Sequence, residues 1–401
     1  MAKEQVTGSD LGRTVLKTEP LISVVMSVFN GEKFLAEAIE SILNQSFRDF
    51  EFIIVDDGST DGSGRIVDSY AEMDRRVRVY HQPNRGLADA SNHGCRLARG
   101  KYIARMDADD VAFSDRLLWQ VDFMEQHPEV GAVGGSVDFI DVQGRRFRTF
   151  RYPLTNEEIR CSLYRVEGNL CHPAALIRKS AFLATAGYRR LFRDAADYDL
   201  WLQIAERSKL ANLDRVVLGY RIHPDQASTR KVKELCLSVL GARRIALSVT
   251  RAAAEALSWP GPMTPELLAQ LGVTREVQQR HLAKWYHYWI CILAQEGDVS
   301  TALSLATEML DSSRWEYVDR TLLAEMWLLA VSLYRRQGMI FRSLKAAARA
   351  VMISPIVAVR LPRPFLRQLV MGLYLRTCGR PFKHALDPGY ETSRNSTWPR
   401  S

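Results

Sequence analysis

Four short apolar runs that alternate with helical segments constrain the fold of this chain most strongly. Each run is followed by residues with apolar side chains at helical spacing; the runs are LISVVMSVF (21–29), FEFIIV (50–55), VRVYH (77–81) and KYIARM (101–106). Strands that alternate with helices at this spacing form βαβ units with right-handed crossovers. The sequence therefore predicts an α/β fold with a mainly parallel sheet, in which ligands bind at the carboxyl ends of the strands.

Carboxylates gather at those predicted strand ends. The first run leads into Phe29, the second into Asp56 and Asp57, and the fourth into MDADD (106–110), which contains Asp107, Asp109 and Asp110. Neighbouring carboxylates repel each other and each prefers water, so the arrangement is poor for stability. We expect this edge of the sheet to bind a cation.

The rest of the chain divides into two further regions. After residue 129 the pattern becomes antiparallel in character, and from about residue 231 it is entirely helical. Two segments, 294–310 and 335–351, match at an offset of 41 residues and indicate helical-hairpin repeats. We predict a disordered leader over 1–20, an α/β domain over 21–230 and a helical, repeat-like domain over 231–401.

Composition narrows the class of protein. With 401 residues, 47% of them hydrophobic, the chain can bury a full core. Its six cysteines lack ligand-like spacing, which argues against a disulfide framework and against a zinc site. The N-terminus lacks the apolar core of a signal peptide, and no long uncharged apolar run follows. We expect a cytoplasmic protein that does not span a membrane.

The basic surplus lies in the C-terminal part. Residues 231–401 contain 23 Lys and Arg against 13 Asp and Glu, and residues 326–386 contain eleven basic residues and no acidic one. Apolar residues between these arginines could place a helix in an anionic membrane surface. Alternatively, the apolar stripe is ordinary helix core and the arginines are solvated. No RNA-binding signature accompanies the pI near 9.2, so we expect no nucleic-acid partner.

Six stretches in a fixed order, over residues 21–228, carry a family resemblance. They are ISVVMSVFNGEKFLAEAIESILNQSFRDFEFIIVDDGSTDGS, NRGLADASNHGCRLARGKYIARMDADD, DRL, HPAALIRKSAF, ADYDLWLQIAERS and YRIHPDQAS. The set resembles the family-two glycosyltransferases of GT-A fold. The resemblance implies a Rossmann-like domain that moves a sugar from a nucleoside diphosphate, such as UDP, to a glycan or lipid-linked acceptor in surface polysaccharide synthesis. It also implies a Mn²⁺ or Mg²⁺ ion and inversion at the anomeric carbon.

The resemblance assigns roles at the acidic strand ends. Asp107 reaches the ribose and the metal-bound waters, and Asp109 is the metal ligand of the DxD motif. Hard oxygen ligands suit such ions, which need only one or two protein carboxylates beside phosphates and water. A solvated acidic loop is the alternative. Asp57 resembles the aspartate that reads the nucleobase, whereas Asp56 orients the loop.

Further nucleotide contacts are expected around the base. Ser27 and Phe29 alternate on the first strand, share one face and would line the nucleobase pocket. Core packing is the alternative for Phe29. Arg85 lies where the family contacts the nucleotide, although an exposed loop arginine fits equally well.

The catalytic base is expected at the start of a later helix. AADYDLW resembles the family's EDYDLW, and its Asp197 matches the base, whereas Ala196 replaces a glutamate and leaves the acceptor open. A first-turn helical acid is the alternative for Asp197. The resemblance further places His223 near the metal or diphosphate and Arg221 near the phosphates, with a structural role as the alternative.

The sequence allows a second function besides that of an enzyme. A nucleotide-sugar-binding or helical-repeat scaffold protein could keep the fold without turnover. The joint presence of Asp57, Asp107, Asp109 and Asp197 favours the glycosyltransferase.

Overall fold

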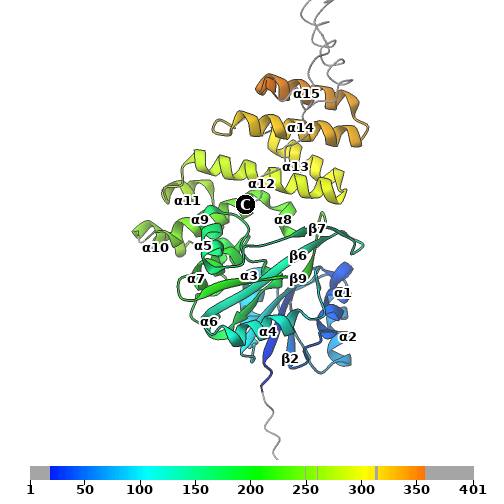
Figure 1. The fold of residues 1–401 in the computed structure, drawn as a ribbon, viewed down its shortest axis with the longest axis vertical. Helices are drawn as coiled ribbons and strands as arrows, with labels where there is room; N and C mark the ends of the chain where they lie inside the picture. The colour runs from blue at the N-terminus through cyan, green and yellow to red at the C-terminus, as the bar shows by residue number, and fades with distance from the viewer. Residues whose placement is uncertain (1–18, 249, 260, 312–314, 357–401) are drawn as a thin grey trace, which may run out of the picture. The chain divides into compact units, whose positions relative to one another are not determined.

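The computed structural model describes residues 19–248, 250–259, 261–311 and 315–356 (Figure 1). The chain divides into two compact units, with the boundary in the sequence between Asp319 and Arg320. The domain boundary proposed at residue 230 therefore remains a prediction, and most of the proposed leader and the end of the basic tail lie outside the described residues. No helix in the described part is long and apolar enough to cross a bilayer.

The first half of the sheet is parallel, as predicted. The strand order is β3-β2-β1-β4-β8-β6-β9-β5, and neighbouring strands within β3-β2-β1-β4 run parallel. These strands are β1 (Ile22–Val28), β2 (Phe50–Asp56), β3 (Val77–His81) and β4 (Tyr102–Asp107). Strands β1 and β2 are buried throughout, which explains their unbroken apolar runs.

The second half of the sheet is mixed. Strand β8 (Leu176–Arg178) runs antiparallel to both β4 and β6 (Val130–Ile140), and β7 (Arg146–Phe150) is antiparallel to β6. However, β9 (Lys209–Arg221) runs parallel to β6, and β5 (Val111–Ala112) pairs antiparallel with β9. The antiparallel expectation after residue 129 is thus correct except for β6 and β9, whose parallel pairing is made possible by the long helical connection between them.

Right-handed crossovers place the first helices. From β1 through β2 to β3 the chain moves across the sheet in one direction, so the right-handed connections α1 (Glu32–Leu43) and α2 (Ser63–Met73) cover the same face. From β3 the chain moves back across the sheet to β4, so the connecting helix α3 (Leu87–Leu97) covers the opposite face. Helix α3 packs closely because Gly94 has no side chain: a Cβ there would lie 2.5 Å from Cγ1 of Val25. Helix α4 (Arg116–Gln126) follows β5 and packs near β6 and β8.

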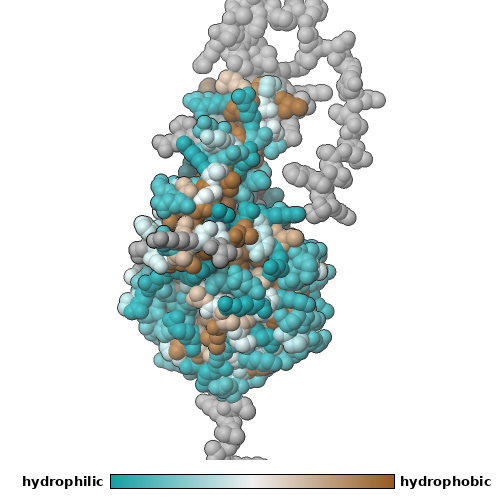
Figure 2. All heavy atoms as spheres, turned by 90° about the vertical axis from the view of Figure 1, so that its left-hand side faces the viewer, coloured by the Kyte–Doolittle hydropathy of each residue, from teal (hydrophilic) through white to brown (hydrophobic). Residues whose placement is uncertain are grey.

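Helices after β7 build the core beneath α3. They are α5 (Asn156–Arg165), the 3-10 helix η1 (His172–Ala174), α6 (Lys179–Leu183), the 3-10 helix η2 (Arg190–Phe192) and α7 (Ala196–Ala205). Trp201 of α7 is fully buried in the same cluster as Val25 and Ile53. Trp201 is therefore a core residue and not part of the site. The face of the molecule seen in Figure 2 is mostly hydrophilic.

The region after the sheet is helical, as predicted. In the first unit it contains α8 (Ala227–Arg230), α9 (Val232–Ala246), α10 (Arg251–Leu257), α11 (Pro265–Gln270), α12 (Arg275–Glu296) and α13 (Val299–Asp311). Helix α9 packs against α7. The second unit contains the hairpin of α14 (Arg320–Arg336) and α15 (Ile340–Ile353).

The two segments that match at an offset of 41 residues have similar local structure. Each contains the end of one helix, a glycine with positive φ and the following helix, and the glycines are Gly297 (φ 109°) and Gly338 (φ 73°). Glycine adopts this left-handed conformation without the steric cost of a Cβ. The predicted helical hairpins are therefore present in both segments.

Candidate active site

The carboxyl ends of β1, β2 and β4 bring the predicted site residues to one edge of the sheet. Asp57 directly follows β2, and its backbone N–H donates to the carbonyl of Val28 at the end of β1. Ser27 and Asp107 are register partners on the paired strands β1 and β4. The sheet therefore places Ser27, Asp57 and Asp107 on adjacent strands, as the sequence predicted.

Asp57 organises the loop between β3 and α3. Its Oδ1 accepts hydrogen bonds from Nε2 of Gln82 (2.7 Å) and the backbone N–H of Arg85 (2.9 Å), and its Oδ2 accepts from the N–H of Gly86 (2.8 Å). Gly86 has a φ of 90°, a conformation that favours glycine. A carboxylate can accept about four hydrogen bonds, so this buried group retains capacity for one further donor.

The neighbouring residues differ in exposure. Asp56 accepts from the backbone N–H of Ser59 and pairs with His81, so it holds its own loop as expected. Phe29 is 51% exposed, which excludes core packing for its ring. Ser27 is buried, with its hydroxyl 3.3 Å from that of Ser91. The side chain of Arg85 is exposed on its loop, and its contact with the nucleotide remains an untested prediction.

The DxD segment is held by the end of β9 and the loop after it. Nε2 of His223 lies 2.9 Å from Oδ2 of Asp109, which brings together the two predicted metal ligands. Asp110 is buried, and its Oδ1 accepts from the backbone N–H of Arg221 (2.8 Å). Burial, together with the charges of Asp109 and Asp107, raises the pKa of Asp110 well above its ordinary value.

Arg221 supports this segment from below. Its guanidinium donates to the carbonyls of Asp109 (2.8 Å) and Asp141 (3.0 Å) and to the Glu37 carboxylate (2.6 Å). The residue is 1% exposed and stacks over the Phe34 ring. These contacts favour the structural alternative, in which Arg221 positions Asp109. A direct contact with the phosphates remains an untested prediction.

Asp107 has an unsatisfied oxygen. Its Oδ1 is buried and has no hydrogen-bond partner among the described residues, although the side chain as a whole is 30% exposed. Nη2 of Arg105 and Nδ1 of His172 lie 3.8 Å and 3.9 Å from this atom, too far for hydrogen bonds. Burial raises the pKa of Asp107 to about 7 against the opposing effect of Arg105. A buried carboxylate oxygen without a donor is a ready acceptor for a ligand or cation.

A buried arginine that the sequence analysis missed lies under the site. Arg105 of β4 is 0% exposed and donates to the carbonyl of Val25 (2.9 Å), to Oγ of Ser91 (3.1 Å) and to Nε2 of His172 (3.2 Å). Its charge interacts with the carboxylates of both Asp107 and Asp197. A lone arginine inside the apolar run KYIARM was the signal that could have identified it.

His172 is neutral and has a defined tautomer. Burial, reinforced by Arg105 and Arg116, lowers its pKa well below 6.5. Its Nε2 faces the Nε–H of Arg105 and the hydroxyl of Tyr188, so Nε2 accepts and the proton lies on Nδ1, on the side of Asp107. The hydrogen-bond network assigns this residue to the site.

Asp197 occupies the first turn of α7. It is half-buried, and burial raises its pKa, while nearby backbone N–H groups oppose that shift. Its charge contributes to the raised pKa of Asp107, so the two carboxylates act on each other. Asp199 instead points into the protein, where it pairs with Arg189 and accepts from Gln203, so its role is structural.

The donor atoms at this site fit a divalent cation. Among the described residues no group of three or more His, Cys, Asp or Glu side chains is arranged to hold a metal. Asp109 and the unsatisfied Oδ1 of Asp107 nevertheless offer hard oxygen ligands two residues apart. Mg²⁺ and similar ions are commonly held by one or two carboxylates, with substrate phosphates and water completing the shell.

Fold and site together define a glycosyltransferase with a GT-A-like sheet and a helical C-terminal region. The model of the family "Glycosyl transferase family 2" matches residues 23–184. The chain is 36% identical to EpsE of Bacillus subtilis over 55% of this chain and 75% of that protein. It is 33% identical to the O-antigen biosynthesis glycosyltransferase WbnJ of Escherichia coli over 54% of this chain and 84% of WbnJ. The chain belongs to glycosyl transferase family 2.

A mannosyltransferase from Pyrobaculum calidifontis in complex with GDP-Man and Mn²⁺ matches 84% of this chain and 88% of its own, with a TM-score of 0.48 and 18% identity.

Proposed function

We propose that this glycosyltransferase depends on a metal ion and inverts the anomeric centre. It moves a sugar from a nucleoside-diphosphate donor to a glycan or lipid-linked acceptor, and a UDP-sugar is the first donor to test. The observation that carries the proposal is the buried, unsatisfied Oδ1 of Asp107 beside the carboxylate of Asp109. A diphosphate with its cation would satisfy both groups. The name of WbnJ supports polysaccharide synthesis as the setting.

The chain's own residues would bind and orient the donor. Asp57 has capacity to accept a hydrogen bond from a nucleobase N–H, such as N3–H of uracil, while it holds the loop of Arg85 and Gly86. The exposed ring of Phe29 is available to contact the base. Asp109, steadied by His223 and Arg221, would bind the cation.

Asp197 would act as the base in a single displacement. The acceptor oxygen forms a bond to the anomeric carbon, the bond from that carbon to the phosphate oxygen breaks, and the hydroxyl proton passes to the Asp197 carboxylate. Its raised pKa strengthens it as a base. A bound Mn²⁺ or Mg²⁺ would act as a Lewis acid toward the departing diphosphate. One displacement inverts the anomeric centre.

The proposal includes a peripheral position on the cytoplasmic side of a membrane. Its support is the basic, acid-free sequence 326–386, of which residues 357–386 lie outside the described part. Arg335, Arg336, Arg342, Lys345 and Arg349 belong to α14 and α15. A membrane location would place the site close to lipid-linked acceptors.

Donor hydrolysis without acceptor tests the central claim. Purified protein should release UDP or GDP from one member of a panel of UDP- and GDP-sugars with Mn²⁺, and EDTA should stop the reaction. Asp109→Asn should abolish metal-assisted binding of the donor, because an amide lacks the charge that holds the cation. Exposed Asp122 on α4 provides the matched control, Asp122→Asn. Unchanged Mn²⁺-assisted affinity in Asp109→Asn would remove the metal assignment.

A further inference from the structure

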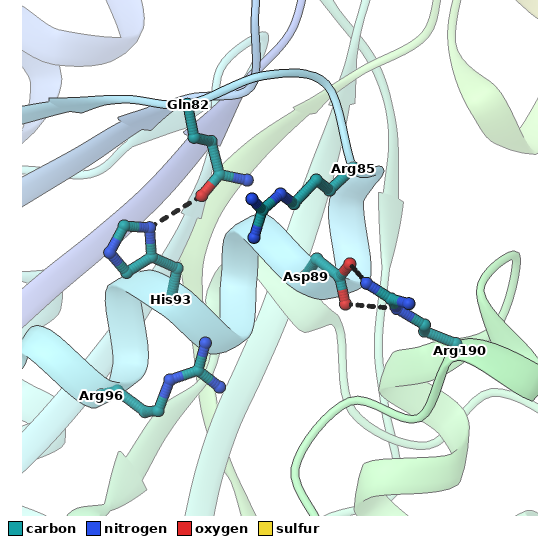
Figure 3. A pocket seen from close by; sticks show the side chains of 6 residues that line it. All are labelled: Gln82, Arg85, Asp89, His93, Arg96 and Arg190. Atoms are coloured by element: carbon teal, nitrogen blue, oxygen red, sulfur yellow. Dashed lines mark hydrogen bonds and ion pairs between the residues drawn. The ribbon is translucent and has the colours of Figure 1, made fainter.

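A basic pocket lies beside the loop that Asp57 organises. Figure 3 shows the cavity, of about 370 Å³, and its lining residues: Gln82, Arg85, Asp89, His93, Arg96 and Arg190. Asp89, His93 and Arg96 are spaced four and three residues apart, so they share one face of α3. The pocket lies on the face of α3 that points away from the sheet, since the buried residues of this helix are Ala88, Ala90, Ser91, Gly94 and Cys95.

The pocket has an excess of positive charge. Arg190 pairs with Asp89 through two hydrogen bonds, Nε to Oδ1 at 2.9 Å and Nη2 to Oδ2, so these two charges cancel. The guanidinium groups of Arg85 and Arg96 have no hydrogen bond or ion pair with any described residue. Two unpaired guanidiniums that face one cavity repel each other, and each retains donors in a fork that matches phosphate or carboxylate.

Gln82 separates the basic pocket from the predicted nucleobase site. Its Nε2 donates to Asp57, so its Oε1 must be the acceptor for Nδ1 of His93 at 2.7 Å. The orientation of the amide is therefore fixed by the carboxylate on one side and by the imidazole on the other. The predicted base contact lies on the Asp57 side of this wall, and the cavity lies on the His93 side.

On its other side the pocket is bounded by Arg190, which is close in sequence to the predicted catalytic base, Asp197. Arg190 lies in η2, seven residues before Asp197, and the segment between them is short. Tyr188 anchors the start of this segment, since its backbone N–H donates to Asn92 Oδ1 and its carbonyl accepts from Asn92 Nδ2. The pocket thus lies beside the segment that positions the base, and Arg85 is the residue that it shares with the predicted donor contacts.

We propose that the basic pocket binds a phosphate or carboxylate group of the acceptor, a proposal that rests on the proposed function. The unpaired donors of Arg85 and Arg96 recognise the anionic group, and the Asp89–Arg190 pair forms the fixed wall. Arginine suits this task because its planar fork binds either anion through two parallel hydrogen bonds. The acceptor class is therefore an acidic glycan or a phosphate-bearing lipid carrier.

The test measures anion binding to the full chain in EDTA, which keeps phosphate from binding through a metal. Inorganic phosphate and glucuronate are titrated and followed by NMR on wild type, Arg96→Gln and the control Arg65→Gln. Arg65 is an exposed arginine on α2 outside the pocket. We expect Arg96→Gln to weaken binding about 10-fold, as for a lost charged hydrogen bond. Equal binding in Arg96→Gln and wild type, or binding of neither anion to wild type, would overturn the proposal.

Two further readouts separate this proposal from others. Binding of phosphate alone would identify a phosphate-bearing acceptor, and binding of glucuronate alone an acidic sugar. UDP affinity should be unchanged in Arg96→Gln; a parallel loss would assign the pocket to the donor and refute the acceptor role. Donor hydrolysis should not depend on added phosphate, whereas activation or inhibition would indicate an effector site and also refute it. Absent Mn²⁺-dependent hydrolysis in wild type would instead refute the proposed function.

Discussion

Nη2 of Arg105 lies 3.8 Å from Oδ1 of Asp107, and the arginine is completely buried while the carboxylate reaches the surface of the site. The guanidinium supplies positive charge beneath a carboxylate that burial alone would leave protonated. Because Arg105 is fully buried and acts through its charge on Asp107 and Asp197, we regard it as a positioning residue for these two carboxylates.

Replacing Arg105 should impair turnover more than folding. Arg105→Met keeps an unbranched side chain but removes the charge near both carboxylates, and we expect donor hydrolysis to fall by roughly 100-fold, the lower end of the loss seen when one electrostatic donor is removed. Arg105→Lys should recover part of the rate. Arg178→Met is the control, because Arg178 on β8 also donates to backbone carbonyls, those of Val130 and Met124, but has none of the site carboxylates among its partners. Wild-type rates in folded Arg105→Met, checked by circular dichroism, would contradict the positioning role.

Asp197 and Asp199 should respond differently to the same change. Asp197→Asn should lower sugar transfer on the order of 10²-fold or more and leave donor affinity near normal, as expected for a general base. Asp199→Asn should instead lower the melting temperature, because it weakens the buried pair with Arg189. Transfer assays and thermal unfolding measure both effects. A fully active Asp197→Asn would return Asp197 to a helix-terminal role.

Asp57→Ala should weaken binding of uridine nucleotides without changing the requirement for metal. The substitution removes the acceptor for the N–H groups of Arg85 and Gly86, so the loop between β3 and α3 loses its anchor as well as its contact with the base. Calorimetry with UDP, in the presence and absence of Mn²⁺, measures the change against Asp122→Ala. Intact UDP affinity in a folded Asp57→Ala protein would rule out the base-reading role.

His281 should make stability fall in mild acid. Burial, reinforced by Arg243 and Lys284, lowers its pKa from 6.5 to about 4. Between these values the unfolded chain takes up a proton that the folded chain does not bind, so stability declines as pH drops from about 6.5 toward 4. We expect His281→Gln to reduce the difference in melting temperature between pH 7 and pH 5. An identical pH dependence in both proteins would show that His281 does not contribute.

The basic C-terminal region should bind anionic membranes. We expect the protein to pellet with anionic liposomes at low salt and to be released by ~0.5 M NaCl, because salt screens surface charge. Deletion of residues 361–401 should weaken the binding. Neutral liposomes are the control, and equal recovery in the supernatant with both kinds would leave the tail with a packing or protein-interaction role.

Strand-end residues were predictable from sequence because a buried strand determines where its last side chains emerge. The apolar runs of β1, β2 and β4 predict where these strands end and therefore where Asp57 and Asp107 lie. The rule of right-handed crossovers is enough to predict that the three strands are parallel. Side-chain partners over long sequence distances were not predictable. The pairing of Arg105 with His172 spans 67 residues, and the burial of Arg221 depends on contacts with Glu37 and Asp141. Such contacts depend on the packing of separate segments, which no local pattern contains.

The hydrogen bond from the N–H of Arg221 to Asp110 joins positions 111 residues apart. During synthesis the whole of β9 must leave the ribosome before this bond can form. Until then Asp110 lacks its backbone donor, and Asp109 lacks both His223 and the guanidinium that holds its carbonyl. A nascent chain that ends before residue 221 would therefore contain the complete DxD sequence in an unsupported loop. Donor binding should begin only when this last strand has been added, which makes nucleotide affinity a marker of late folding.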